Sequence, residues 1–204
     1  MKKDFNINKE LYIINQIGRR IVGSQFVIDD FNREVIIKLI FYFQENKNCE
    51  NYNLKLNKGI LLVGSNGTGK TKLIRIFRMY YFHYQRKGWI EISAKDAVSL
   101  YQINGMEALD KYMNAKDYNP VQVYIDDLGS EPIFASYFGT KVDVIKEILN
   151  SRYRQFEKGK LTFATTNLDT SDLKARYGER IYSRMSEMYN FIYIQGEDRR
   201  MKNI

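Results

Sequence analysis

Residues 64–71 of this chain read GSNGTGKT, which matches the phosphate-binding pattern G-x-x-x-x-G-K-[ST]. The glycines permit a tight loop whose backbone N–H groups can surround phosphate oxygens, and the positive end of a following helix adds to the attraction. In such a loop the lysine reaches the β- and γ-phosphates, and the next hydroxyl ligates Mg²⁺. We therefore predict that ATP or ADP binds together with Mg²⁺, with Thr71 as a ligand of the metal. The predicted nucleotide-binding residues are Gly64, Ser65, Asn66, Gly67, Thr68, Gly69, Lys70, Thr71 and Lys72.

A pair of carboxylates, Asp126 and Asp127, directly follows the apolar run at residues 121–125. A carboxylate at the end of a strand can hold Mg²⁺ through its water shell, and an adjacent one can orient and deprotonate an attacking water. We assign Asp126 to the metal and Asp127 to the water, although many ATPases carry the longer glutamate at the second position. The alternative is an Asx-type turn, which would leave unexplained why the pair follows an apolar strand.

Asn167 comes just after another predicted strand, at residues 161–165. If that strand is a neighbour of the one before the acidic pair, the Asn167 amide can hydrogen-bond a γ-phosphate or the attacking water. We predict this sensing role for Asn167. The alternative is that it belongs to a cluster that caps the start of a helix, for which Thr170, Ser171 and Asp172 are better placed.

Three arginines, Arg176, Arg180 and Arg184, recur at every fourth position and would line one face of a continuous helix. Like charges at this spacing destabilise an isolated helix, so an anionic partner is expected to compensate. Such a partner is either a γ-phosphate bound to a neighbouring subunit, contacted by an arginine finger, or a nucleic-acid backbone. The alternative is a solvated helix face. Arg199 and Arg200 form a second basic pair that could fold back on the subunit's own nucleotide.

The elements that must position these residues follow from hydrophobic periodicity. Short apolar runs predict strands at residues 59–63, 89–92, 121–125, 161–165 and 191–194. Helical spacing predicts helices at residues 5–21, 29–47, 70–85, 94–116 with a break near 104–105, 142–153 and 173–188 in one or two pieces, and a polar run at 46–53 predicts a surface loop. Strands that alternate with helices indicate an α/β fold with a mainly parallel five-stranded sheet covered on both faces. The glycine-rich motif then lies between a strand and a helix, which favours phosphate binding over an ordinary turn.

Composition limits the class of protein. The chain has 204 residues, 44% of them hydrophobic and 14% aromatic, which is enough for one ordinary domain and argues against disorder. Its formal net charge of +8 favours polyanionic partners, although coding bias towards lysine could produce the same value. A single cysteine, Cys49, cannot form an internal disulfide, and no apolar run is long enough to span a bilayer. We expect a cytoplasmic protein with no membrane partner.

Together these residues resemble the AAA+ ATPases of the bacterial helicase-loader family, the DnaC/DnaI-like group, and the related IstB-type transposition helpers. The resemblance rests on GSNGTGKT, YIDDLGSEP, RYR, TFATTN, GERIYSRM and GEDRR, in that order within residues 24–204. It implies a three-layer P-loop NTPase fold of the AAA+/ASCE type, and the family also carries the Asp-Asp pair. It further implies that Asn167 is the sensor-1 residue, that Arg184 or the neighbouring Arg180 is the arginine finger, and that Arg200 is the sensor-2 arginine.

Two departures from the family pattern concern domain organisation. Loaders of this family carry a separate helicase-binding domain, whereas we expect only a helical extension at residues 1–23 before an ATPase core at residues 24–204. We also expect no extended helical lid.

The leading hypothesis is an Mg²⁺-dependent ATPase of the helicase-loader type that self-associates on single-stranded DNA, with a replicative helicase as a further partner. Hydrolysis would be weak in the monomer, since the finger must come from a neighbouring subunit. A second hypothesis is a transposition helper that binds duplex DNA. A third, from another class, is a small-molecule kinase, and a fourth is a nucleotide-binding module without turnover.

Overall fold

The computed structural model describes residues 5–113 and 122–199, which divide into two compact units. Unit 1 comprises residues 1–56, 66–88 and 194–204, and unit 2 comprises residues 57–65 and 89–193. The division between the units falls within the phosphate-loop motif, since residues 64 and 65 belong to unit 2 and residues 66–71 belong to unit 1. Within the described ranges, no helix has both the length and the apolar character needed to cross a membrane.

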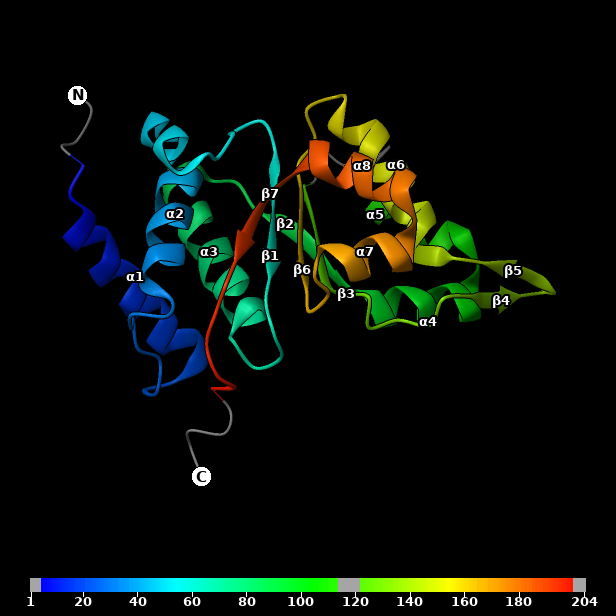
Figure 1. Cartoon of the computed structure of the whole chain (residues 1–204), viewed down its shortest axis with the longest axis horizontal. Coiled ribbons are helices and arrows are strands. Elements are labelled where there is room, and N and C mark those ends of the chain that lie inside the picture. The colour runs from blue at the N-terminus through cyan, green and yellow to red at the C-terminus, as the bar shows by residue number, and fades with distance from the viewer. Residues whose placement is uncertain (1–4, 114–121, 200–204) are drawn as a thin grey trace. The chain divides into compact units, whose positions relative to one another are not determined.

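Unit 2 is built on a parallel sheet, which the described residues form from five strands in the order β2-β3-β6-β1-β7 (Figure 1). These strands are β1 (Gly59–Val63), β2 (Trp89–Ser93), β3 (Gln122–Leu128), β6 (Thr162–Thr166) and β7 (Tyr189–Tyr193). All five correspond to predicted strands, because short buried runs such as GILLV are typical of parallel sheets that are covered on both faces. The sheet confirms the predicted α/β class. Leu128 pairs with Thr166, so β3 and β6 end side by side.

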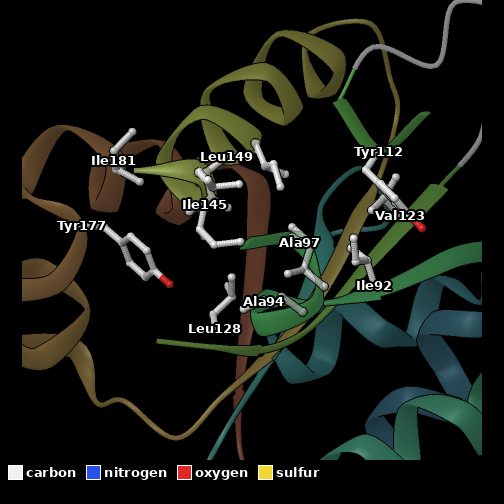
Figure 2. Close-up of a cluster of buried hydrophobic side chains, with 14 of the residues drawn as sticks. Ile92, Ala94, Ala97, Tyr112, Val123, Leu128, Ile145, Leu149, Tyr177 and Ile181 are labelled. Carbon is white, nitrogen blue, oxygen red and sulfur yellow. The ribbon is translucent and has the colours of Figure 1, made fainter. Parts of the chain in front are cut away.

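Helices of unit 2 pack against this sheet around one apolar cluster. Ile92 and Val123 of the sheet share it with Ala97, Ile145 and Leu149 of the helices (Figure 2). The helices are α4 (Ala94–Asn104), the 3₁₀ segment η2 (Met106–Leu109), α5 (Asp110–Met113), α6 (Val144–Phe156), α7 (Thr170–Tyr177) and α8 (Glu179–Met188). The predicted break in the helix at 94–116 occurs at residue 105, a glycine with a φ of +71°. Residues 114–116 of that predicted helix lie outside the described part of the chain.

The helix predicted at residues 173–188 is divided into α7 and α8. Gly178 separates them with a φ of +84°, a left-handed conformation that ends α7. Of the two predicted alternatives, one helix or two, the structure shows two. The condition for a single arginine stripe, a continuous helix, is therefore not met, since Arg176 lies on α7 and Arg180 and Arg184 lie on α8. The residue that caps the start of α7 also differs from the expected Thr170, Ser171 or Asp172. The cap is Asp169, whose side chain accepts from the backbone N–H of Asp172 at 2.8 Å.

A hairpin follows β3 that the sequence analysis does not predict. Strands β4 (Ala135–Tyr137) and β5 (Thr140–Val142) pair in antiparallel register. Their two-residue turn is formed by Phe138 and Gly139, with φ of +44° and +82°. Both values suit a primed turn, but the usual asparagine or aspartate is replaced by phenylalanine, so the sequence carries no strong hairpin signal.

Unit 1 contains three α-helices among its described residues, α1 (Ile7–Val22), α2 (Arg33–Phe43) and α3 (Lys70–Gln85). Helix α2 begins later than predicted because residues 29–32 form a turn instead. In that turn the carboxylate of Asp29 accepts from the backbone N–H groups of Phe31 and Asn32. Helix α1 packs against α3 within unit 1, and the boundary expected between residues 23 and 24 remains a prediction.

The predicted surface loop at residues 46–53 is a 3₁₀ helix, η1 (Lys47–Tyr52). The loop prediction is therefore corrected. The Asn46 side chain accepts from the backbone N–H of Asn48 at the start of η1, and Cys49 within η1 is fully buried. Burial, together with the charge of Glu50, raises the pKa of the Cys49 thiol.

Candidate active site

The phosphate-loop motif joins the end of β1 to the start of α3, which is the arrangement that its mechanism requires. Gly64 donates its backbone N–H to the carbonyl of Thr166 at 3.3 Å in unit 2. In unit 1, Gly67 and Gly69 have φ of +76° and +94°, which a residue with a Cβ rarely adopts. Gly69 is the N-cap position of α3, so the loop leads directly into the positive end of that helix. These local backbone features are compatible with the predicted phosphate loop.

Within unit 1, the segment that follows β7 lies against this loop. The backbone N–H of Arg199 donates to the Gly67 carbonyl at 3.0 Å, and a Cβ built on Gly67 would lie 1.9 Å from a carboxylate oxygen of Asp198. The Arg199 guanidinium is engaged elsewhere, in a two-point ion pair with Asp29 at 2.9 Å. Burial would raise the pKa of Asp29, but its hydrogen bonds and the charge of Arg199 hold that pKa below its ordinary value. Arg200, the predicted sensor-2 residue, lies outside the described residues.

In unit 2, the acidic pair and the predicted sensor meet at the ends of β3 and β6. The Asn167 amide donates to the Asp127 carboxylate at 2.6 Å. Thr165 joins the two aspartates, since its hydroxyl donates to Asp126 at 2.6 Å and accepts from the Asp127 backbone N–H at 2.9 Å. Tyr124 also donates its hydroxyl to Asp126. The condition set by the sequence analysis, that these strands are neighbours, is met.

Asp127 has an unusual backbone conformation. Its φ is +60°, and the β3–β6 pairing shifts register between Ile125 and Leu128, as in a β-bulge. A residue with a Cβ held in this left-handed region costs about 1 kcal/mol or more, and such strain often occurs at functional sites. The bulge turns the Asp127 carboxylate towards Asn167. Sequence reasoning predicted roles for both aspartates and Asn167 but did not single out Tyr124 or Thr165 as their hydrogen-bond partners.

The donors available for a metal ion suit Mg²⁺. This ion prefers oxygen ligands and usually binds through one or two protein groups together with phosphates and water. The sequence predicts Asp126 and Thr71 as the protein ligands of the metal. Their roles remain those predicted from the sequence.

The three arginines have different surroundings. Arg176 is buried in ion pairs with Glu131 at 2.7 Å and Asp143 at 2.8 Å, so it is not available to phosphate or nucleic acid. Arg184 donates to the Asn150 side chain and stacks over the Tyr153 ring, 5.0 Å from its centroid. Arg180 is exposed in the first turn of α8. Of the predicted stripe, only Arg180 and Arg184 remain candidates for contact with an anionic partner.

Glu131, which the sequence analysis did not single out, is the centre of a buried polar cluster in unit 2. Its side chain accepts from the backbone N–H of Gly129 and the hydroxyl of Tyr177, both at 2.8 Å, as well as from Arg176. Burial and the negative charge of Glu131 raise the pKa of Tyr177 well above its ordinary value. Burial alone would lower the pKa of Arg176, but its two carboxylate partners raise it. No local pattern marks Glu131, because its side-chain partners on α7 lie far along the chain.

Comparison with known proteins finds a matching family and several related proteins. Residues 60–187 match the model of the family described as "ATPase family associated with various cellular activities (AAA)". Among curated proteins, an ATP-dependent zinc metalloprotease FtsH from Staphylococcus haemolyticus is 28% identical over 111 residues, or 54% of this chain. The match spans only 15% of that relative's length.

Solved structures resemble the fold. The DnaC helicase loader superimposes with a TM-score of 0.60 and 21% identity, covering 88% of this chain and 99% of the other. DnaI superimposes with a TM-score of 0.58 and 22% identity, covering 91% and 93% of the two chains. At these identities the likeness shows the fold alone.

Proposed function

The chain belongs to the AAA family of ATPases, and from this premise we propose that it is an Mg²⁺-dependent ATPase acting in DNA replication as a helicase-loader-like protein on single-stranded DNA. Family membership implies ATP binding and hydrolysis. The finer proposal draws on the site residues, on the basic charge of the chain and on the structural likeness to DnaC and DnaI.

The phosphate loop would bind the nucleotide. Its backbone N–H groups and the start of α3 would surround the phosphates, and Lys70 would neutralise the β- and γ-phosphates. Mg²⁺, when bound through Thr71 and Asp126, would supply positive charge to the transferring phosphoryl group. ADP would occupy the same loop after hydrolysis.

The observation that carries the proposal is the hydrogen bond between Asn167 and Asp127 beside Asp126. Asp127 would accept a proton from the attacking water as the water oxygen bonds to the γ-phosphorus and ADP leaves. Asn167 would orient the Asp127 carboxylate, which keeps the acceptor aimed at one position. A nucleotide-binding module without turnover would have no use for this arrangement.

A neighbouring subunit would complete the site with a cation from α8. Arg184 is the candidate that the family resemblance suggests, and Arg180 is the candidate that is more exposed. Removal of an arginine finger lowers turnover by roughly a thousandfold or more in other NTPases. We therefore expect little hydrolysis by an isolated subunit.

The test is the ATPase rate per subunit, measured as phosphate release against protein concentration, with and without single-stranded DNA. The rate should rise with both. A rate independent of both would contradict the proposal. Greater stimulation by duplex DNA at matched salt would favour a transposition helper, and phosphate transfer to a metabolite instead of water would indicate a kinase.

The finger is identified by mixing variants. Asp127→Asn keeps both arginines but lacks the water-activating group, whereas Arg180→Ala or Arg184→Ala keeps that group. Mixing Asp127→Asn with the variant that lacks the finger should restore turnover, because each supplies what the other lacks. Lys174→Ala, which removes another exposed cation nearby, should hydrolyse ATP at the wild-type rate.

A further inference from the structure

The turn that follows Asp127 needs outside support to keep its shape. Asp127 and Gly129 have φ of +60° and +91°, and among the described residues the turn shows a 3.2 Å hydrogen bond from the Ser130 N–H to the Asp127 carbonyl. Because the first of these positions carries a Cβ, the turn persists only if surrounding groups hold it. The direction of the Asp127 carboxylate depends on that support.

One support comes from the end of β6. The Thr166 hydroxyl donates to the Leu128 carbonyl at 2.7 Å. Leu168 packs so closely over Gly129 that a Cβ there would lie 2.3 Å from a methyl carbon of Leu168. These contacts hold one side of the turn against the strand that carries the sensor residue.

The other support is the side chain of Glu131. It folds back to accept the Gly129 N–H at 2.8 Å, which fixes the peptide two residues after Asp127. Figure 2 shows the hydroxyl of Tyr177 on the side of Leu128, and this hydroxyl donates to Glu131 at 2.8 Å. The Glu131 side chain is fully buried, and such a carboxylate is costly unless a cation and hydrogen bonds satisfy it.

Arg176 supplies that cation from α7. Its guanidinium bridges Glu131 at 2.7 Å and Asp143 at 2.8 Å with only 9% of its side chain exposed. Asp143 in turn caps α6 by accepting from the Lys146 N–H at 3.3 Å. Buried ion pairs add little net stability compared with apolar packing. Their effect here is to hold the buried side chains and the backbone they contact in one arrangement. That arrangement includes the turn at Asp127.

We propose that Glu131 and Arg176 form a positioning pair, which holds the turn after Asp127 and thereby aims its carboxylate at the attacking water. The inference rests on the proposed ATPase activity. A displacement of about 1 Å of a reacting group can lower a rate by up to a hundredfold, so weakening the pair should lower kcat and leave nucleotide affinity unchanged.

The experiment compares Glu131→Gln with Glu34→Gln in the full chain. Glu34 is a matched control because it also pairs with a cation, Lys38, but its side chain is 73% exposed. kcat is measured with single-stranded DNA and normalised to the nucleotide sites that titrate with a non-hydrolysable ATP analogue. Glu131→Gln should lower kcat about tenfold, with the analogue's Kd within about twofold of wild type, while Glu34→Gln changes neither.

A kcat for Glu131→Gln equal to that of Glu34→Gln would overturn the inference, and so would an equal loss of affinity and kcat. If Glu131→Gln does not fold, Tyr177→Phe removes a single hydrogen bond and should lower kcat about threefold at constant Kd. An unchanged kcat in that variant would also overturn it. A wild-type chain that hydrolyses no ATP would overturn the proposed function itself, which is a distinguishable result.

Discussion

Two buried glutamates show how differently a carboxylate can be accommodated. Glu10 in unit 1 and Glu131 in unit 2 are each only 6% exposed. Glu10 accepts hydrogen bonds from the hydroxyls of Tyr80 and Tyr84, both at 2.7 Å, and no described residue forms an ion pair with it. Glu131 has a buried arginine as well as a hydroxyl and a backbone N–H.

The difference lies in what each cluster joins. The Glu10 cluster ties α1 to α3, and Gln44 at the end of α2 adds a 2.6 Å hydrogen bond to Tyr80. The Glu131 cluster ties α7 to the turn that bears Asp127. The first cluster should therefore matter for stability alone, and the second for stability and turnover. Four predictions test that distinction, in order of decreasing expected effect.

The largest effect is expected for Arg176→Met. It would leave the buried Glu131 without a cation and Asp143 with only Lys146, at 3.5 Å, and breaking such a buried pair costs about 3–5 kcal/mol. Urea denaturation should show the free energy of unfolding lowered by about that amount. A loss below about 1 kcal/mol would mean that water reaches and solvates the two carboxylates.

A smaller effect is expected for Tyr80→Phe. This change removes one of the two hydroxyls that satisfy Glu10, so the free energy of unfolding should fall by about 1–2 kcal/mol. ATP turnover per folded subunit should stay at the wild-type value, in contrast to Glu131→Gln. A tenfold loss of kcat would remove the distinction between the two clusters.

The third prediction concerns alkaline pH. The pKa values of Tyr80 and Tyr84 are both raised above the ordinary value for tyrosine. Burial is the larger cause, and the hydrogen bond to Glu10 is the second. The contribution of the two tyrosines to stability is therefore complete below the unfolded pKa of about 10 and declines as pH rises above it, since the unfolded chain then releases protons that the folded chain keeps. Urea midpoints should fall above that pH, and the fall should be shallower in Tyr84→Phe. An identical decline in that variant would contradict the assignment.

The smallest effect is expected for Lys174→Met on α7. Lys174 pairs with Glu179 at 3.4 Å, but their side chains are 40% and 78% exposed. Exposed pairs contribute little, so the free energy of unfolding should change by less than about 1 kcal/mol. Measured beside Arg176→Met, this variant separates the effect of burial from that of losing a positive charge on the same helix.

Much of the site could be predicted from the sequence because its signals are local. The phosphate loop is a contiguous motif, and Asp126, Asp127 and Asn167 each follow a short apolar run. The parallel sheet brings those run ends together, so proximity followed from strand order. The hairpin at Phe138 and Gly139 could not be predicted, because its turn residues are not those that mark such turns.

The arginines show the limit of periodicity. A spacing of four predicts one helix face only if the helix is continuous, and the left-handed Gly178 divides it. A glycine is compatible with a helix interior as well as with its end, so the sequence did not distinguish the two. The three arginines therefore do not form one stripe. Arg176 is held in ion pairs, and Arg180 and Arg184 remain candidates for contact with an anionic partner.

The sequence by itself determined where the five strands of the parallel sheet run, where the phosphate-loop motif lies and which carboxylates follow those strands, since these depend on neighbours within a few residues. Only the tertiary structure decided that Arg176 pairs with Glu131, which lies 45 residues earlier in the chain. That pairing depends on how β3, α6 and α7 pack together. Local propensity does not encode it, because the energy of a buried charge is set by whichever groups the fold brings around it.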